Sequence, residues 1–137
     1  MISFLTDNIK MPKLDRKAVR AWITAVVAGY DNRKVGRLNY IFCNDDRILE
    51  VNRQFLGHDY YTDIITFDYS ESGVVSGDMY ISLETVKTNS SKFGTSYDEE
   101  LMRVMIHGVL HLCGIDDKGP GERAVMEAAE NRALEMW

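Results

Sequence analysis

Residues 96–117 read SYDEELMRVMIHGVLHLCGIDD, and this stretch guides the interpretation of the whole chain. Ser96 and Glu99 have the spacing of a capping box, in which each side chain accepts a hydrogen bond from the other residue's backbone N–H. The apolar residues that follow predict a buried helix that runs to about Cys113. Gly114 can end that helix, because glycine adopts the left-handed conformation without steric strain.

Two histidines lie on one face of this predicted helix. His107 and His111 are four residues apart, a spacing that brings side chains together on a helix surface. Because Gly114 can turn the chain back, the side chain of Asp117 can face the same point. Two nitrogens and one carboxylate are a donor set typical of catalytic zinc, which keeps a fourth position for water or substrate. The sequence therefore predicts one metal ion bound by His107, His111 and Asp117.

A histidine on a helix is more often a surface residue or a hydrogen-bonded core residue. Here, however, two of the chain's three histidines fall within five residues and have apolar neighbours. Burying two imidazoles without partners would cost roughly 1–3 kcal/mol each, and metal ligation removes that cost. The spacing therefore favours the metal site, and a domain that contains no metal stays as an alternative.

The rest of the chain predicts an α+β protein. Apolar periodicity predicts helices from Asp15 to Gly29, after Asn44 with Ile48, Val51 and Phe55 on one face, over 83–93, up to Cys113, and over 122–137. Alternating β-forming residues predict strands over 37–43, 64–69 and 78–82, of which the last two form an antiparallel pair. Residues 70–77 are predicted to connect these two strands. We expect one domain over residues 1–137, with a small mixed sheet of about four strands and about five helices.

The composition is that of an ordinary globular protein, with 45% hydrophobic and 27% charged residues. No apolar run approaches the roughly eighteen residues that cross a bilayer, and the N-terminus lacks the pattern of a secretory signal. Cys43 and Cys113 have no CxxC spacing. We therefore expect two reduced, buried thiols in a cytoplasmic protein without a membrane partner.

The net charge of −5 is unevenly distributed. Residues 1–37 carry eight Lys or Arg and three Asp, whereas residues 38–137 carry eight basic and eighteen acidic side chains. An acidic chain is a poor candidate for strong non-specific binding to nucleic acid, because phosphate neutralisation supplies most of that affinity. The basic N-terminal third is consistent with a local patch, although a solvated helix face is the favoured interpretation.

The histidine pattern has the spacing of the H-E-x-x-H-x-x-G-x-x-H zinc proteases, with two differences. Gly108 stands where those enzymes have their glutamate base, and Asp117 stands where they have a third histidine. Peptide hydrolysis needs a group beside the metal that takes and returns a proton. Gly108 cannot do this, so a protease relative stays as an alternative in which another part of the fold supplies the base.

The stretch from Asn52 to Asp117 resembles the YbeY endoribonucleases, which are also described as ribosomal RNA maturation factors. The motifs that match, in chain order, are TDIITF (62–67), GDM (77–79), EL (100–101) and HGVLHLCGIDD (107–117). Met126 stands where this family commonly has a methionine in its last helix. Gly108, which is unexpected for a protease, is the residue that the family has.

The resemblance implies a zinc-hydrolase-like α+β fold and a metal-dependent, single-strand-specific endoribonuclease. It further implies a role in ribosomal RNA maturation and ribosome quality control, with ribosomal RNA and the small ribosomal subunit as partners and no small-molecule cofactor. The family positions that bind its metal, generally taken as zinc, match His107, His111 and Asp117. We therefore expect one Zn²⁺ ion, or another divalent ion, per chain.

Two residues depart from the family pattern. The family usually has a third histidine at the position of Asp117, and a carboxylate there makes a harder site that broadens the choice of metal. Many members carry an arginine where this chain has Leu56, and leucine cannot bind a phosphate by bidentate hydrogen bonds. Arg103, one turn before His107, and His58 in the loop are candidates for a substitute charge. The plainer interpretations are an ion pair for Arg103 and an exposed polar residue for His58.

We expect the metal to act as a Lewis acid in phosphodiester hydrolysis, with attack by an activated water or by the substrate's own 2′-hydroxyl. Asp63 or Asp116 is expected to orient the attacking group or the imidazoles, although Asp63 can simply begin a strand and Asp116 can simply cap a turn. The candidate catalytic residues are His107, His111, Asp117, Arg103 and Asp63. The main alternative is a ribosome-assembly factor with a structural metal and no catalytic activity.

Overall fold

The computed structural model describes residues 1–137, which form four strands and five helices. In chain order these are β1 (Ile2–Thr6), α1 (Arg16–Ala28), β2 (Lys34–Cys43), α2 (Asp45–Leu56), β3 (Ile64–Asp68), β4 (Val74–Ser82), α3 (Leu83–Phe93), α4 (Tyr97–Leu112) and α5 (Glu122–Glu135). The α+β class with about four strands and five helices is therefore confirmed. No helix is both long and apolar enough to span a membrane.

The four strands form one mixed sheet in the order β1-β2-β4-β3. β1 runs parallel to β2, and β2 runs parallel to β4. β3 pairs antiparallel with β4, from Ile64 opposite Ile81 to Asp68 opposite Gly77, which confirms the expected antiparallel pair. Because β3 is the last strand of the sheet, its outer edge and the loop before it are free to form the side of a groove.

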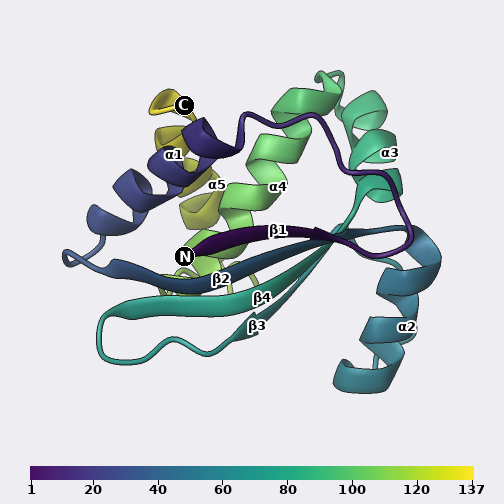
Figure 1. Cartoon of the computed structure of the whole chain (residues 1–137), viewed down its shortest axis with the longest axis horizontal. Coiled ribbons are helices and arrows are strands. Elements are labelled where there is room, and N and C mark those ends of the chain that lie inside the picture. The colour runs from purple at the N-terminus through teal and green to yellow at the C-terminus, as the bar shows by residue number, and fades with distance from the viewer.

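The helices cover the two faces of the sheet unequally (Figure 1). α1, α3, α4 and α5 lie together above one face, and the main cluster of 27 buried hydrophobic residues fills the space between them and the strands. α2 packs on the opposite face, where Cys43, Ile48, Val51 and Ile65 form a second, smaller cluster. Both cysteines are buried and free, and each packs within one of the two clusters.

α4 is the central helix of the upper layer, and most of its residues are buried. It begins with the expected capping box, in which Ser96 and Glu99 each bond the other's backbone. The hydroxyl of Tyr40 on β2 is fully buried and donates a hydrogen bond of 2.8 Å to the carbonyl of Met105. This bond ties the helix to the sheet two residues before the first of its histidines.

Gly108 sets how closely α4 approaches the sheet. A Cβ atom at this position would lie 2.7 Å from Sδ of Met79 on β4 and 2.8 Å from Cδ1 of Ile64 on β3. Both distances are shorter than van der Waals contact, so a side chain here would force Met79 and Ile64 to move or α4 to shift away from the sheet. Position 108 therefore faces Met79 and Ile64, and glycine offers no side chain that could act as a catalytic base.

Three details of the sequence prediction are corrected by the structure. β1 was not expected, because a short apolar run such as ISFLT does not distinguish a strand from other structure until a partner strand is known. β4 begins at Val74, so the connection after β3 is shorter than the predicted 70–77. In α2 the buried face carries Asn52 in place of Phe55, whose side chain is exposed.

We predict that Gly108→Ala destabilises the protein by about 1–3 kcal/mol, the usual cost of inserting a methyl group into a well-packed core. Chemical denaturation measures this change. Ile64→Val removes the Cδ1 atom that the new methyl would meet, so the double variant should recover part of the loss. Strict additivity of the two single variants would contradict this explanation, because non-additivity reports direct contact.

Candidate metal centre

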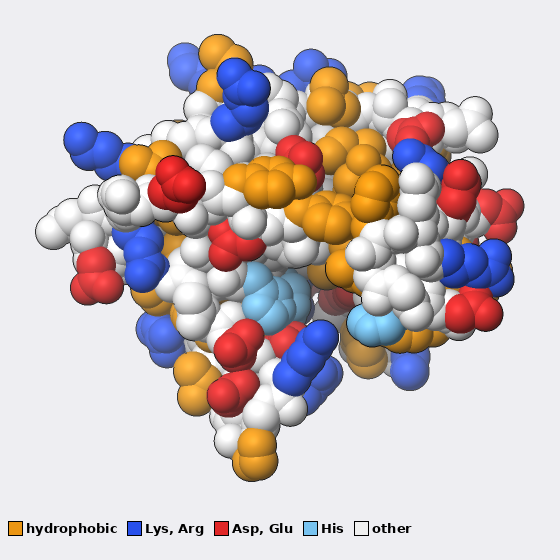
Figure 2. Space-filling model, turned by 90° about the horizontal axis from the view of Figure 1, so that it is seen from below, with side chains coloured by type: hydrophobic (Ala, Val, Ile, Leu, Met, Phe, Trp, Pro, Cys, Tyr) orange, Lys and Arg blue, Asp and Glu red, His pale blue; other side chains and the backbone are white.

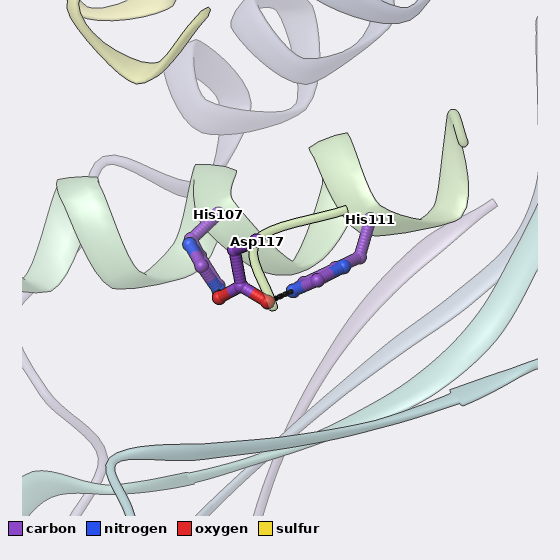
Figure 3. Close-up of side chains that lie close together, drawn as sticks. All are labelled: His107, His111 and Asp117. Atoms are coloured by element: carbon purple, nitrogen blue, oxygen red, sulfur yellow. Dashed lines mark ion pairs between the residues drawn. The ribbon is translucent and has the colours of Figure 1, made fainter. Parts of the chain in front are cut away.

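The open side of α4 carries one polar stripe. Arg103, His107 and His111 follow one another at four-residue steps, and each is partly exposed while their neighbours are buried. Both imidazoles point to the same side of the helix, and the Asp117 carboxylate lies between them (Figure 3). The prediction that these three side chains converge is therefore correct.

The turn after α4 brings Asp117 back over the helix. Gly114 has a φ of 95°, its N–H bonds to the carbonyl of His111 at 2.9 Å, and the N–H of Ile115 bonds to the carbonyl of Leu110 at 3.1 Å. These two bonds define a Schellman motif, which requires a left-handed residue at the position of Gly114. The motif reverses the chain and so determines where the carboxylate can lie.

The three candidate ligands are close enough to share one ion. Nε2 of His107 lies 3.4 Å from Oδ2 of Asp117, and Nε2 of His111 lies 3.4 Å from Oδ1 of the same carboxylate. All three donor atoms lie within 4.8 Å of one another. Ligand atoms at about 2.0–2.1 Å from a tetrahedral zinc ion are themselves separated by about 3.4 Å. The donor set and its spacing therefore fit a metal ion.

Glu130 on α5 orients the first of the two histidines, and sequence reasoning missed it. Nδ1 of His107 donates to Oε2 of Glu130 at 2.7 Å, which leaves the lone pair on Nε2 directed at the candidate metal position. Arg103 donates to the other carboxylate oxygen of Glu130 at 2.8 Å and to Oδ1 of Asn131 at 2.8 Å. No motif in the closing helix marks Glu130; only its burial in an otherwise polar stretch indicates a role.

The same contacts shift the acidity of the groups in the site. Burial disfavours the protonated form of His107, but the hydrogen bond and the charge of Glu130 outweigh it and raise the pKa of this imidazole. Burial and the neighbouring His107 lower the pKa of His111. Burial acts against ionised Glu130, yet its bonds from His107 and Arg103 hold the pKa below its ordinary value. Glu130 is thus an anion that stabilises whatever positive charge His107 carries.

Two hollows meet at His107 and Asp117. The first, which we call the α5-side cavity, has a volume of about 410 Å³ and is lined mainly by α3, α4 and α5, including Arg103 and Glu130. The second, which we call the loop-side groove, has a volume of about 500 Å³ and lies between α4, β3 and the loop over 57–63. His107, Asp117 and Asp63 line both hollows. The candidate metal centre is therefore open on two sides.

The other candidate residues from the sequence line one or both of the two hollows. Asp63 stands at the start of β3, where burial raises the pKa of its carboxyl, and it forms no hydrogen bond with either histidine. Asp116, Leu56 and His58 line the loop-side groove. Arg103 lines the α5-side cavity, but its guanidinium is engaged by Glu130 and Asn131. The ion-pair interpretation of Arg103 is therefore observed.

A four-stranded mixed sheet under a buried helix, with two imidazoles and one carboxylate on its open side, defines an α+β protein with a candidate metal centre. The family model described as Endoribonuclease YbeY matches residues 2–137. The chain therefore belongs to the endoribonuclease YbeY family, as the sequence motifs indicated.

Individual relatives agree with this assignment. The chain is 63% identical to an endoribonuclease YbeY of Bacteroides fragilis over 98% of this chain and 96% of that protein. It is 47% identical to the endoribonuclease YbeY of Porphyromonas gingivalis, over 98% of this chain and 89% of that protein. The solution structure of a Thermotoga maritima protein matches with a TM-score of 0.69 at 29% identity, over 99% of this chain and 88% of that one. The family model and the two endoribonuclease relatives confirm the expected enzyme class, a nuclease.

We predict that Gly114→Ala weakens metal binding while Gly114→Asn largely retains it. A Cβ at this position would meet no atom within 4 Å, so any effect comes from the positive φ alone. That φ costs alanine about 1–2 kcal/mol and is tolerated by asparagine. Titration against a competing chelator measures the affinity. Equal affinities for the two variants would contradict a conformational role for this residue.

We also predict that Glu130→Gln lowers metal affinity by roughly tenfold to 100-fold, the usual effect of removing a partner of a ligating histidine. Glu127→Gln is the matched control, because Glu127 lies on the same helix and lines the same α5-side cavity without a hydrogen bond to His107. The same chelator competition applies to both variants. A similar loss in the control would show that the effect is merely one of net charge.

Proposed function

We propose that this protein is a metal-dependent, single-strand-specific endoribonuclease that acts in ribosomal RNA maturation and ribosome quality control in the cytoplasm. One ion per chain is bound by His107, His111 and Asp117, and residues 1–137 act as a single metallohydrolase domain. The observation that carries the proposal is the convergence of these three donor atoms within 4.8 Å. The YbeY names of the matching proteins support RNA as the substrate.

The chemistry of the donors supports a catalytic ion over a structural one. Structural zinc sites usually have four protein ligands, whereas three ligands that include histidine and a carboxylate leave a position for substrate. The two hollows that meet at His107 and Asp117 give a substrate access from the surface. We propose zinc as the resident ion, and the carboxylate of Asp117 extends the choice towards harder divalent ions.

When bound, the ion would supply Lewis acidity, which stabilises charge on a phosphate oxygen and activates a water or a 2′-hydroxyl for attack. The protein's own groups would then position the reaction. Glu130 holds the His107 ring through Nδ1, and Arg103 holds Glu130, so that the imidazole cannot rotate away from the ion. Asp63, which borders both hollows, is the group placed to orient the attacking oxygen by a hydrogen bond.

The alternatives receive less support from the site. A protease would need a base beside the ion, and position 108 faces Met79 and Ile64 in the sheet. A non-catalytic assembly factor would be consistent with Leu56, which lies in the loop-side groove and offers no charge to a phosphate. Against a purely structural ion, only three protein ligands converge here, which leaves a position for substrate.

We predict that His111→Ala and Asp117→Asn each lose the bound metal and lower RNA cleavage at least 100-fold, because either change removes one of three ligands. Asp116→Asn is the matched control, since it removes a neighbouring carboxylate from the same turn and should retain the metal. Elemental analysis of protein purified without a metal-affinity tag, and cleavage of a single-stranded RNA, give the two measurements.

The proposed role in ribosomal RNA maturation can be measured separately, in cells, with the same variants. Cells that lack the protein should accumulate unprocessed ribosomal RNA precursors, and the wild-type protein but not His111→Ala should restore processing. Cleavage by metal-free His111→Ala in a nuclease-free preparation would refute the mechanism. Normal ribosomal RNA in the absence of the protein would refute the ribosomal role alone.

A further inference from the structure

Beside the candidate metal centre, the loop-side groove carries aromatic side chains that the proposed mechanism does not use. His107, His111 and Asp117 line one side of this groove, and His58 and Tyr60 from the loop over 57–63 line the other. Figure 2 shows histidine side chains on both sides of a hollow in this face, with hydrophobic side chains gathered along one margin. The loop therefore faces the candidate ligands across an open space.

His58 and Tyr60 form a stacked pair of rings. Their centroids are 5.2 Å apart with an interplanar angle of 20°, and the Tyr60 hydroxyl lies 3.1 Å from Nδ1 of His58. Both residues are exposed, with Tyr60 at 52%, and neither belongs to a buried hydrophobic cluster. The pair therefore contributes little to the core, and the ring faces turned away from each other are the ones a ligand can contact.

Contacts with α2 hold the loop that carries the two rings in place. Asn52 on α2 is 1% exposed, and its Nδ2 donates to the carbonyl of Tyr60 at 2.9 Å. The carbonyl of Asn52 in turn accepts a hydrogen bond of 3.1 Å from the N–H of His58. Gly57 ends α2 in the left-handed conformation, and Arg53 pairs with Asp59. The ring pair is thus preorganised, which reduces the entropy lost when a ligand binds.

The charge of the groove limits which kind of contact could bind RNA there. Lys118 is the one Lys or Arg side chain that lines it, against the carboxylates of Asp63, Asp68, Asp116 and Asp117. Neutralisation of phosphates, which supplies most of the affinity of nucleic-acid-binding proteins, is therefore weak at this position. Stacking of bases on aromatic rings does not need positive charge, accepts any base, and requires a base that is not already paired.

We propose that the stacked pair of His58 and Tyr60 is a nucleobase subsite, which holds an unpaired base of the RNA next to the phosphate at the candidate metal centre. The proposal rests on the proposed function in that it takes the ligand to be RNA. It adds the contact through which a single strand is distinguished from a duplex, since a base within a duplex cannot reach the face of Tyr60. Tyr60 is the stacking residue, and His58 is the positioning residue behind it.

The test uses a single-stranded 2′-O-methyl RNA oligonucleotide that contains 2-aminopurine, a base whose fluorescence is quenched when it stacks. The wild-type protein and Tyr60→Phe should quench it with similar affinity, because both keep the ring. Tyr60→Ala should bind roughly 5-fold to 150-fold more weakly and quench less. Tyr61→Ala is the matched control, because Tyr61 is also exposed, at 57%, and does not line the groove.

Two further measurements on the same preparations complete the design. The KM for cleavage of single-stranded RNA should rise in Tyr60→Ala while kcat and the metal content stay within about threefold of the wild type, which is the signature of lost binding. A duplex of the same sequence should compete poorly with the single strand. Far-ultraviolet circular dichroism checks that each variant is folded, which we expect because Tyr60 is exposed.

Each outcome has a defined meaning. The subsite would be overturned if Tyr60→Ala binds the oligonucleotide and quenches its fluorescence within about twofold of the wild type. It would also be overturned if Tyr61→Ala loses as much affinity as Tyr60→Ala. A duplex that binds as tightly as the single strand would also overturn it. Normal quenching by a wild-type protein that holds no metal and cleaves no RNA would refute the proposed function and support the subsite, so the two failures are distinguishable.

Discussion

The burial of α4 is the constraint on which the rest of the structure depends. The sheet encloses this helix on one side, and α1, α3 and α5 enclose much of the remainder (Figure 1). Polar side chains on such a helix are tolerated only where partners satisfy them. His107 and His111 therefore lie on the one stripe that remains open, and Gly108 between them lets the helix approach the strands closely. The same packing that stabilises the fold thus aligns the two imidazoles.

Partners for that stripe come from separate parts of the chain. Asp117 arrives from the turn after α4, and Glu130 arrives from α5 to bind Nδ1 of His107. Arg103 then completes a chain of contacts in which each charged group has an opposite charge beside it. Because Glu130 is nearly buried, loss of His107 or Arg103 would leave one of its carboxylate oxygens without a partner, which is more costly than loss of a surface ion pair. The centre is therefore rigid on its α5 side.

The loop-side groove differs from the α5 side in the charge and polarity of its lining, and these properties limit which substrate it can bind. Carboxylates outnumber basic side chains around it, whereas Leu56, Tyr60 and Ile64 give it apolar and aromatic surface. An anionic polymer is a poor match for such a surface unless a cation offsets the charge at its centre and bases contact the rings. In the proposed function, the candidate metal centre would meet the first requirement at the phosphate, and the stacked pair of His58 and Tyr60 would meet the second at the base.

Local patterns in the sequence predicted a large part of this protein, because capping and glycine-terminated turns involve residues close together in the chain. The four-residue spacing of His107 and His111 and the turn at Gly114 were sufficient to predict that Asp117 converges with them. Tertiary structure alone decided the contact between Glu130 and His107, the pairing of β1 with β2, and the position of the α2–β3 loop across the groove. Each of these joins residues far apart in sequence, and no local periodicity or spacing records which distant segments will pack together.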